Sequence, residues 1–386
     1  MGKISLISVD IDRPNGVYIA GEYINGTLTV DVAEPLKVRG VQIKFKGFAK
    51  VHWTEQHGSG KNRHTVHYHN EETYFNEKRV VLGRGTKESG EDTVMTPQRY
   101  QFPFQFVIPH HIPSSFEGVH GRVRYHIKGK VDIPMAFDKE FQRPFTIIAN
   151  VDLNQMPTAR QALQNEDQKT LCCCCCESGP ISAVIRVDKT GYVPGEGIRI
   201  SGEITNNSNN KMDSSKVVID QRIAFHATSK TRWTSSHIAK IKKGEIAPGG
   251  TEVWTGEAIQ IPPCPPSMLQ GCNIIDVIYV LKLVVDPSGP SFDLEVPIEI
   301  VIGTIPLRDF FYPYTQAPAH MNIAQPGGFG MQQPVASAPP APVSNDLYPP
   351  PPSYAECVYG EGGSAFKDDN DKHQPFVPTY AYYGWT

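Results

Sequence analysis

Apolar and polar residues alternate along much of the first 305 residues of this 386-residue chain. Every second residue of 100–106 is aromatic. In 123–133 the odd positions are apolar, Gly129 apart, and the even ones are Arg, His, Lys or Asp. Residues 41–46 repeat the alternation. A period of two predicts strands with one buried and one solvated face. Because no window shows a comparable helical period, the chain is predicted to be all-β.

The same order of sequence landmarks occurs twice. Tyr18 to Glu22 (YIAGE) matches Tyr192 to Glu196 (YVPGE), an offset of 192 − 18 = 174. Later, Tyr125 matches Tyr279, an offset of 279 − 125 = 154. An extra polar loop in the first copy, over 52–73, accounts for the difference. We therefore predict two tandem immunoglobulin-like β-sandwiches.

Composition places the domain boundaries. The sandwiches are predicted at 1–153 and 180–307, joined by a Gln-rich and Cys-rich linker at 154–179. Residues 311–386 contain thirteen of the 33 prolines, two lysines, and almost no Ile, Leu or Val. Such a segment buries too little apolar surface to offset the entropy of ordering. Residues 308–386 are therefore predicted to be a disordered Pro-rich tail.

Charge and cysteine usage narrow the compartment and the partners. The formal net charge of −3 argues against nucleic acid. No apolar stretch reaches the ~20 residues of a membrane helix, and the N-terminus lacks a signal-peptide core, so a cytoplasmic protein with peripheral membrane association is expected. Five of the eight cysteines form one run, which suits a reducing compartment better than a disulfide framework.

Neither catalysis nor a cofactor is predicted. The sequence contains no GxSxG, HExxH, P-loop or strand-linked GxGxxG motif. Five histidines lie in the extra loop of the first copy: His52, His57, His64, His67 and His69. Metal binding there is one interpretation. A solvated polar hairpin is the other, and it is favoured because no carboxylate pattern accompanies the histidines.

Several short motifs resemble those of the arrestin domain-containing proteins, the α-arrestins. The motifs are Asp12-Arg13-Pro14 with Gly16-Val17-Tyr18 and Gly21-Glu22, Gly191-Tyr192 with Pro194-Gly195-Glu196, Pro262 to Ser267, and Gly271 to Ile275. The resemblance covers residues 5–305. It implies two arrestin-type sandwiches that bind cargo through concave faces, followed by a tail that carries PPxY motifs.

The tail contains one complete PPxY motif, formed by Pro351, Pro352 and Tyr354. The preceding prolines favour polyproline II, the conformation that WW domains bind. Proline-rich composition alone also produces such motifs by chance. With the arrestin-like body, the motif indicates WW domains of HECT-type E3 ubiquitin ligases. Pro378 and Tyr380, preceded by Val377, form either a degenerate second motif or an ordinary aromatic tail end.

Two further features are candidate sites. Arg122, Arg124, Lys128 and Lys130 share one face of the predicted strand at about 6.6 Å spacing, which suits phosphates on cargo tails. An ordinary solvated sheet face is the alternative. Cys172, Cys173, Cys174, Cys175 and Cys176 suit S-palmitoylation. An unmodified linker is the alternative, and adjacent cysteines disfavour zinc.

The combined interpretation is a non-enzymatic trafficking adaptor. It is expected to bind receptor or transporter tails, recruit a Nedd-type HECT ligase, and act in endocytosis and endosomal sorting at the plasma membrane and endosomes. The alternatives are a coat-like arrestin-fold subunit of an endosomal sorting complex, a cargo scaffold without a ligase, and a metal or thiol enzyme.

Overall fold

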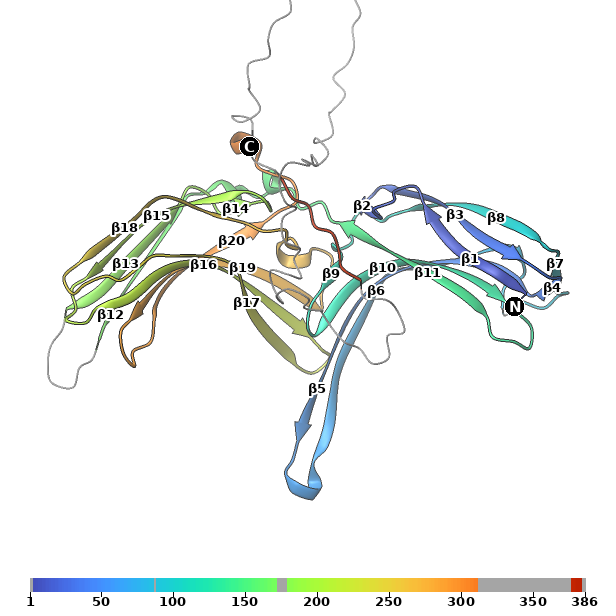
Figure 1. The fold of residues 1–386 in the computed structure, drawn as a ribbon, viewed down its shortest axis with the longest axis horizontal. Coiled ribbons are helices and arrows are strands. Elements are labelled where there is room, and N and C mark those ends of the chain that lie inside the picture. Colours follow the sequence, from blue (N-terminus) through green and yellow to red (C-terminus); the bar gives the residue numbers. More distant parts are fainter. Residues whose placement is uncertain (1–2, 87, 172–178, 312–375, 384–386) are drawn as a thin grey trace, which may run out of the picture.

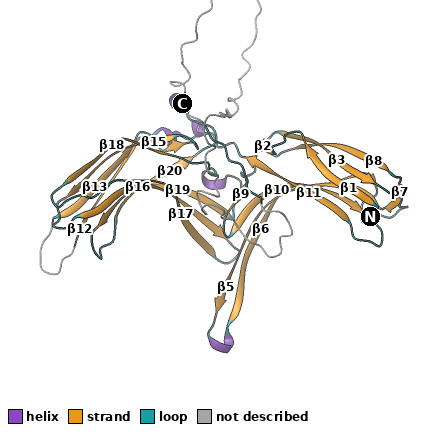
Figure 2. Ribbon diagram, in the orientation of Figure 1, coloured by secondary structure: helices purple, strands orange, loops and turns teal. Residues whose placement is uncertain are grey.

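The computed structural model describes residues 3–86, 88–171, 179–311 and 376–383. Two β-sandwiches lie on either side of a central junction (Figure 1). Strands form most of both, and the helical elements are short (Figure 2). The helical elements are η1 (Gly60–Asn62), η2 (Leu153–Gln155), η3 (Pro157–Arg160), η4 (Ser267–Leu269) and α1 (Arg308–Phe311). The all-β prediction is confirmed.

The first sandwich holds the strands that the alternation predicted. Its strands are β1 (Ile4–Ile11), β2 (Val17–Ile19), β3 (Tyr23–Val32), β4 (Leu36–Val38), β5 (Gly40–His57), β6 (His64–Gly83), β7 (Thr93–Met95), β8 (Gln98–Val107), β9 (Phe116–Glu117), β10 (Gly121–Asp132) and β11 (Lys139–Ile148). One sheet has the order β1-β3-β8 and the other β2-β11-β10-β5-β6, with β9 on β10 and a separate β4-β7 pair. Tyr125 and Ile127 of β10 are buried, whereas His126 and Lys128 are partly exposed. Phe45 stacks on Phe106 of the opposite sheet at 4.5 Å.

The second sandwich repeats this arrangement. Its strands are β12 (Leu163–Thr170), β13 (Pro180–Val187), β14 (Gly191–Tyr192), β15 (Gly197–Asn206), β16 (Met212–His226), β17 (Thr231–Lys242), β18 (Thr251–Gln260), β19 (Ile275–Pro287) and β20 (Leu294–Ile302). The sheet orders are β12-β13-β15-β18 and β14-β20-β19-β16-β17. In each copy a buried tyrosine hydroxyl donates to a proline carbonyl, Tyr125 to Pro113 at 2.6 Å and Tyr279 to Pro265 at 2.7 Å. The predicted duplication is confirmed.

The predicted extra loop of the first copy is the outer half of the β5–β6 hairpin, which projects from the sandwich (Figure 1). The hairpin also contacts the second sandwich. Lys230 pairs with Glu55 at 2.6 Å, and the side chain of Asn273 donates to Glu72 at 2.7 Å. The Asn70 amide donates to the carbonyl of His226 at 3.2 Å. The hairpin therefore holds the two sandwiches together, a role that its polar composition did not predict.

The predicted linker at 154–179 is not uniform. Strand β12 pairs with β13 from Leu163↔Val187 to Thr170↔Pro180, so residues 163–170 of the stretch belong to the second sandwich. Its side chains are exposed or half-buried, as is usual for an edge strand that carries charges to discourage further pairing. Because β12 has this polar composition, its sequence could not be distinguished from that of a linker.

The prediction of a disordered tail at 308–386 also needs correction at both ends. Helix α1 begins at Arg308, and Leu307 beside it is buried. Residues 376–383 are extended and lie against the junction, because Pro378 and Tyr380 bury their side chains there. The rest of the predicted tail, 312–375 and 384–386, lies outside the described residues.

Candidate functional site

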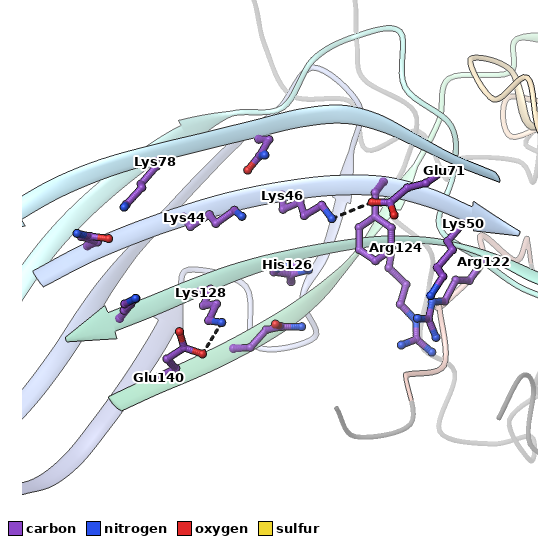
Figure 3. A pocket seen from close by; sticks show the side chains of 15 residues that line it. Lys44, Lys46, Lys50, Glu71, Lys78, Arg122, Arg124, His126, Lys128 and Glu140 are labelled. Atoms are coloured by element: carbon purple, nitrogen blue, oxygen red, sulfur yellow. Dashed lines mark hydrogen bonds and ion pairs between the residues drawn. The ribbon is translucent and has the colours of Figure 1, made fainter. Parts of the chain in front are cut away.

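A hollow of about 720 Å³ lies on the β6-β5-β10-β11 sheet of the first sandwich (Figure 3). The side chains that line the hollow come from the solvent-facing side of the sheet, so the lining is polar. The basic lining residues are Lys44, Lys46, Lys50, Lys78, Arg122, Arg124, His126, Lys128 and Lys130. The acidic ones are Glu71 and Glu140. The hollow therefore carries a marked excess of positive charge.

Strand register sets like charges opposite one another in this hollow. Lys44 of β5 is paired with Lys128 of β10 on one side and with Lys78 of β6 on the other. The three lysines therefore form a row across adjacent strands, which lie about 4.8 Å apart. Like charges that face each other across strands destabilise a sheet. Strand pairing alone therefore does not favour this row.

Among the residues that the structure describes, ion pairs reach one end of this row, Lys128, but not its middle, Lys44. Glu71 pairs with Lys46 at 3.1 Å, and Glu140 pairs with Lys128 (Figure 3). For Lys44, the described part of the chain supplies no carboxylate within ion-pairing distance. Burial, reinforced by Lys46, Lys128 and Lys78, lowers the pKa of Lys44 below its ordinary value. An incoming anion would relieve that repulsion.

The four residues predicted for a phosphate-binding face lie together in the hollow, but they differ in burial and in their pairing with carboxylates. Arg122 is buried, and Arg124 makes two contacts with Glu117 at 2.5 and 3.0 Å. Lys130 pairs with Asp138 at 2.5 Å, and this hydrogen bond raises its pKa. Arg124 and Lys130 are thus already neutralised by carboxylates of the chain.

Lys44, Lys46 and Lys78 were not predicted as site residues. They come from two strands that pair with the predicted one, and one strand's alternation does not reveal its neighbour's register. The available signal was the alternating Gln42, Lys44 and Lys46 pattern, which has the same polar phase as the β10 strand. Aligning the polar positions of this segment with those of the β10 segment would have indicated that their lysines lie on the same face of one sheet.

Of the predicted ligase-binding residues, the structure describes only the second set. Pro351, Pro352 and Tyr354 lie outside the described residues, as does the run Cys172–Cys176. Pro378 and Tyr380 are both buried, whereas Val377 and Thr379 are exposed. The predicted disorder is therefore wrong for this short stretch, whereas the degenerate second motif at Pro378 and Tyr380 stays a prediction.

The histidines of the extra loop lie on the β5–β6 hairpin, as the polar-hairpin interpretation predicted. His52 stacks on His67 with ring centroids 5.7 Å apart, and His57 faces His64 at 6.1 Å. Within the described ranges, no group of three or more His, Cys, Asp or Glu side chains is placed to hold a metal ion. The same ranges contain no helix long and apolar enough to cross a membrane.

Comparison with known proteins assigns both sandwiches. Residues 7–154 match the arrestin (or S-antigen) N-terminal domain, and residues 177–307 match the arrestin (or S-antigen) C-terminal domain. Arrestin domain-containing protein 17 of Caenorhabditis elegans is 31% identical over 325 residues, 79% of this chain and 72% of that protein. Mouse arrestin domain-containing protein 4 is 30% identical over 305 residues, 78% and 71% of the two chains. Rat thioredoxin-interacting protein is 29% identical over 305 residues, 78% and 74%.

Proposed function

Because the chain belongs to the arrestin domain-containing family, the α-arrestins, and is an arrestin-like adaptor rather than an enzyme, we propose that it links membrane-protein cargo to a HECT-type E3 ubiquitin ligase. The hollow of the first sandwich binds an acidic or phosphorylated segment of a receptor or transporter. The PPxY motif binds a WW domain of the ligase. The ligase then ubiquitinates the cargo, which enters endosomal sorting.

The lysine row is the observation that carries the cargo half of this proposal. Lys44 stands between Lys78 and Lys128 on adjacent strands, although like charges at these positions oppose folding. A phosphate that bridges two neighbouring ammonium groups is compatible with strand spacing. A sheet hollow that concentrates positive charge also attracts anionic segments before contact.

The ligase half rests on sequence. Pro351, Pro352 and Tyr354 form the motif whose prolines stack between aromatic rings of a WW domain and whose tyrosine fills a second pocket. Single contacts of this kind have micromolar or weaker affinity, about −6 to −8 kcal/mol. Tyr354→Ala empties one of the two pockets, so binding of an isolated WW domain to the full chain should fall by at least about tenfold.

Titration of the full chain with an isolated WW domain measures this loss. Tyr348→Ala, a tyrosine six residues earlier and outside the motif, is the matched control and should bind like wild type. If Tyr354→Ala binds as well as wild type, the ligase has no part in the mechanism. A cargo-binding scaffold or a coat-like subunit would then explain the fold.

The cysteine run supports a proposal for membrane attachment. In the sequence, residues 172–176 fall between the end of β12 at Thr170 and the start of β13 at Pro180, and these two residues pair in the structure. Acylation of two or more cysteines would hold the adaptor at plasma and endosomal membranes, whereas a single acyl chain gives only reversible binding. Acyl-exchange labelling of wild type against a variant with all five cysteines changed to serine tests this, and an absence of thioesters would refute it.

A further inference from the structure

Residues 376–383, here called the docked segment, cross from one sandwich to the other (Figure 1, red). Their hydrogen bonds include Thr379 N to Thr146 Oγ1 (3.3 Å), Tyr383 N to Pro194 O (3.0 Å), Tyr383 Oη to Thr304 O (2.7 Å) and Gln260 Nε2 to Tyr382 Oη (3.1 Å). Thr146 belongs to the first sandwich and the other three partners to the second. We call the surface formed by Thr146, Pro194, Gly195, Gln260 and Thr304 the junction site.

Burial alternates along the docked segment as it does along a strand. Pro378 and Tyr380 point inward and are buried, whereas Val377 and Thr379 are exposed. Tyr380 is 9% exposed and is part of the main hydrophobic core. Burial also raises the pKa of Tyr383. The segment therefore makes specific contacts with the junction site and is not merely lying on the surface.

A glycine in the second sandwich admits the backbone of the docked segment. A Cβ on Gly195 would lie 2.0 Å from the carbonyl oxygen of Tyr383. The equivalent glycine of the first sandwich, Gly21, has nearly the same backbone angle, φ +94° against +92°. A Cβ there would instead meet the side chain of His110. The two copies thus share one turn, but only the second uses its glycine to receive the segment.

We propose that the junction site is a peptide-binding site whose ligand is the docked segment of the same chain, and that this binding withholds Tyr380 from WW domains. The competition rests on the ligase recognition proposed above. A WW domain needs the proline and tyrosine of its motif exposed. Pro378 and Tyr380 are the two motif positions that the junction site buries. One side chain cannot fill both sites, so the two complexes exclude each other.

Hydrogen exchange on the full chain tests the binding half without any ligase. The amides of Thr379 and Tyr383 donate hydrogen bonds, so they should exchange at least about tenfold more slowly than in a synthetic peptide of residues 370–386. Gly195→Ala should return them to the peptide rate. Gly21→Ala introduces the same backbone strain but should leave them protected. Exchange at the peptide rate in wild type would overturn the proposal.

A second variant, within the docked segment itself, keeps the test decisive if Gly195→Ala fails to fold. Tyr383→Ala removes the ring and the hydrogen bond to Thr304 but leaves residues 377–380 intact. It should expose the Thr379 amide to exchange at the peptide rate. Retained protection of Thr379 in a folded Tyr383→Ala variant would also contradict the proposal.

The competition half needs a complete motif in the docked segment. Val377→Pro supplies the missing proline at an exposed position, and Tyr354→Ala silences the first motif. An isolated WW domain should bind this full chain about tenfold more weakly than the free peptide with the same Val377→Pro change. Adding Tyr383→Ala should restore binding to the level of the free peptide.

The outcomes separate this inference from the proposed function. Equal affinity for the full chain and the free peptide would refute the competition. A free peptide that fails to bind would refute the competition but not the ligase recognition through Tyr354, which the Tyr354→Ala titration tests separately. The exchange experiment still decides in that case whether the junction site binds the docked segment.

Discussion

The two sandwiches share a scaffold but differ in charge at equivalent strand positions. The offset of 174 relates Lys44 to position 44 + 174 = 218, which is Val218, and Lys46 to Asp220. The offset of 154 relates Lys128 to Lys282. Strand register agrees, since Lys44 pairs with Lys128 and Val218 pairs with Lys282. At these equivalent positions only the first copy sets two lysines opposite each other, although Lys216 faces Lys242 elsewhere in the second copy.

Both copies pair the shared lysine with a carboxylate, Lys128 with Glu140 and Lys282 with Glu295, and the second copy adds a further carboxylate, Asp220. Lys282 contacts Asp220 and Glu295, each at 2.8 Å. Although burial alone lowers the pKa of Lys282, the hydrogen bonds to these carboxylates raise it above its ordinary value. The fold therefore accepts valine and aspartate where the first copy has Lys44 and Lys46. The scaffold therefore does not require those lysines, which supports the proposal that they bind an anion.

The largest expected effect concerns Asp220, the buried carboxylate that pairs with Lys282 in the second copy. Asp220→Ala removes a carboxylate that contacts both Lys282 and His237. Asp220 and Lys282 are almost fully buried, so the ammonium group loses a buried partner. We expect the free energy of unfolding to fall by about 3 kcal/mol. Chemical denaturation of the full chain measures this change.

The equivalent change in the first copy is the control. Lys46→Ala removes a half-buried lysine whose partner, Glu71, is largely exposed. Its effect on the free energy of unfolding should stay within about 0.5 kcal/mol. Similar losses in the two variants would show that the two faces do not differ as their contacts imply.

The next effect concerns binding. Lys44→Val combined with Lys46→Asp gives the first copy the residues of the second. The hollow loses its central positive charge, so affinity for a phosphoserine-containing acidic peptide should fall by about 10- to 100-fold at low salt. The difference should shrink as ionic strength rises. Fluorescence titration at two salt concentrations measures both effects.

A charge-matched variant on the other sandwich excludes a general effect of net charge. Lys240→Val with Lys242→Asp makes the same change on β17, where both lysines are exposed. It should bind the peptide like wild type. If it loses as much affinity as the first-copy variant, bulk charge rather than the hollow recognises the peptide.

The sequence predicted the sandwiches well because alternation and duplication are local signals that burial reinforces. It predicted the face of β10 but missed Lys44 and Lys78, whose importance depends on the register between strands. It also missed the docked segment. Tyr380 lies in a proline-rich stretch with few aliphatic residues, and its burial depends on a surface shared by the two sandwiches. Contacts between distant segments leave no periodicity in either one.

The smallest effect, a gain in stability, separates the cost of the lysine row from its function. Lys44→Val removes repulsion from Lys46, Lys78 and Lys128, partly offset by Glu140. We expect unfolding to require about 0.5–1 kcal/mol more free energy near neutral pH. Since burial and these lysines lower the folded-state pKa of Lys44, the unfolded chain binds the proton more tightly. Wild-type stability should therefore rise as pH increases from the folded-state pKa to the ordinary lysine pKa, and the advantage of Lys44→Val should narrow. Denaturant titrations at neutral and alkaline pH measure the difference, and a constant advantage would mean that packing rather than charge repulsion explains the gain.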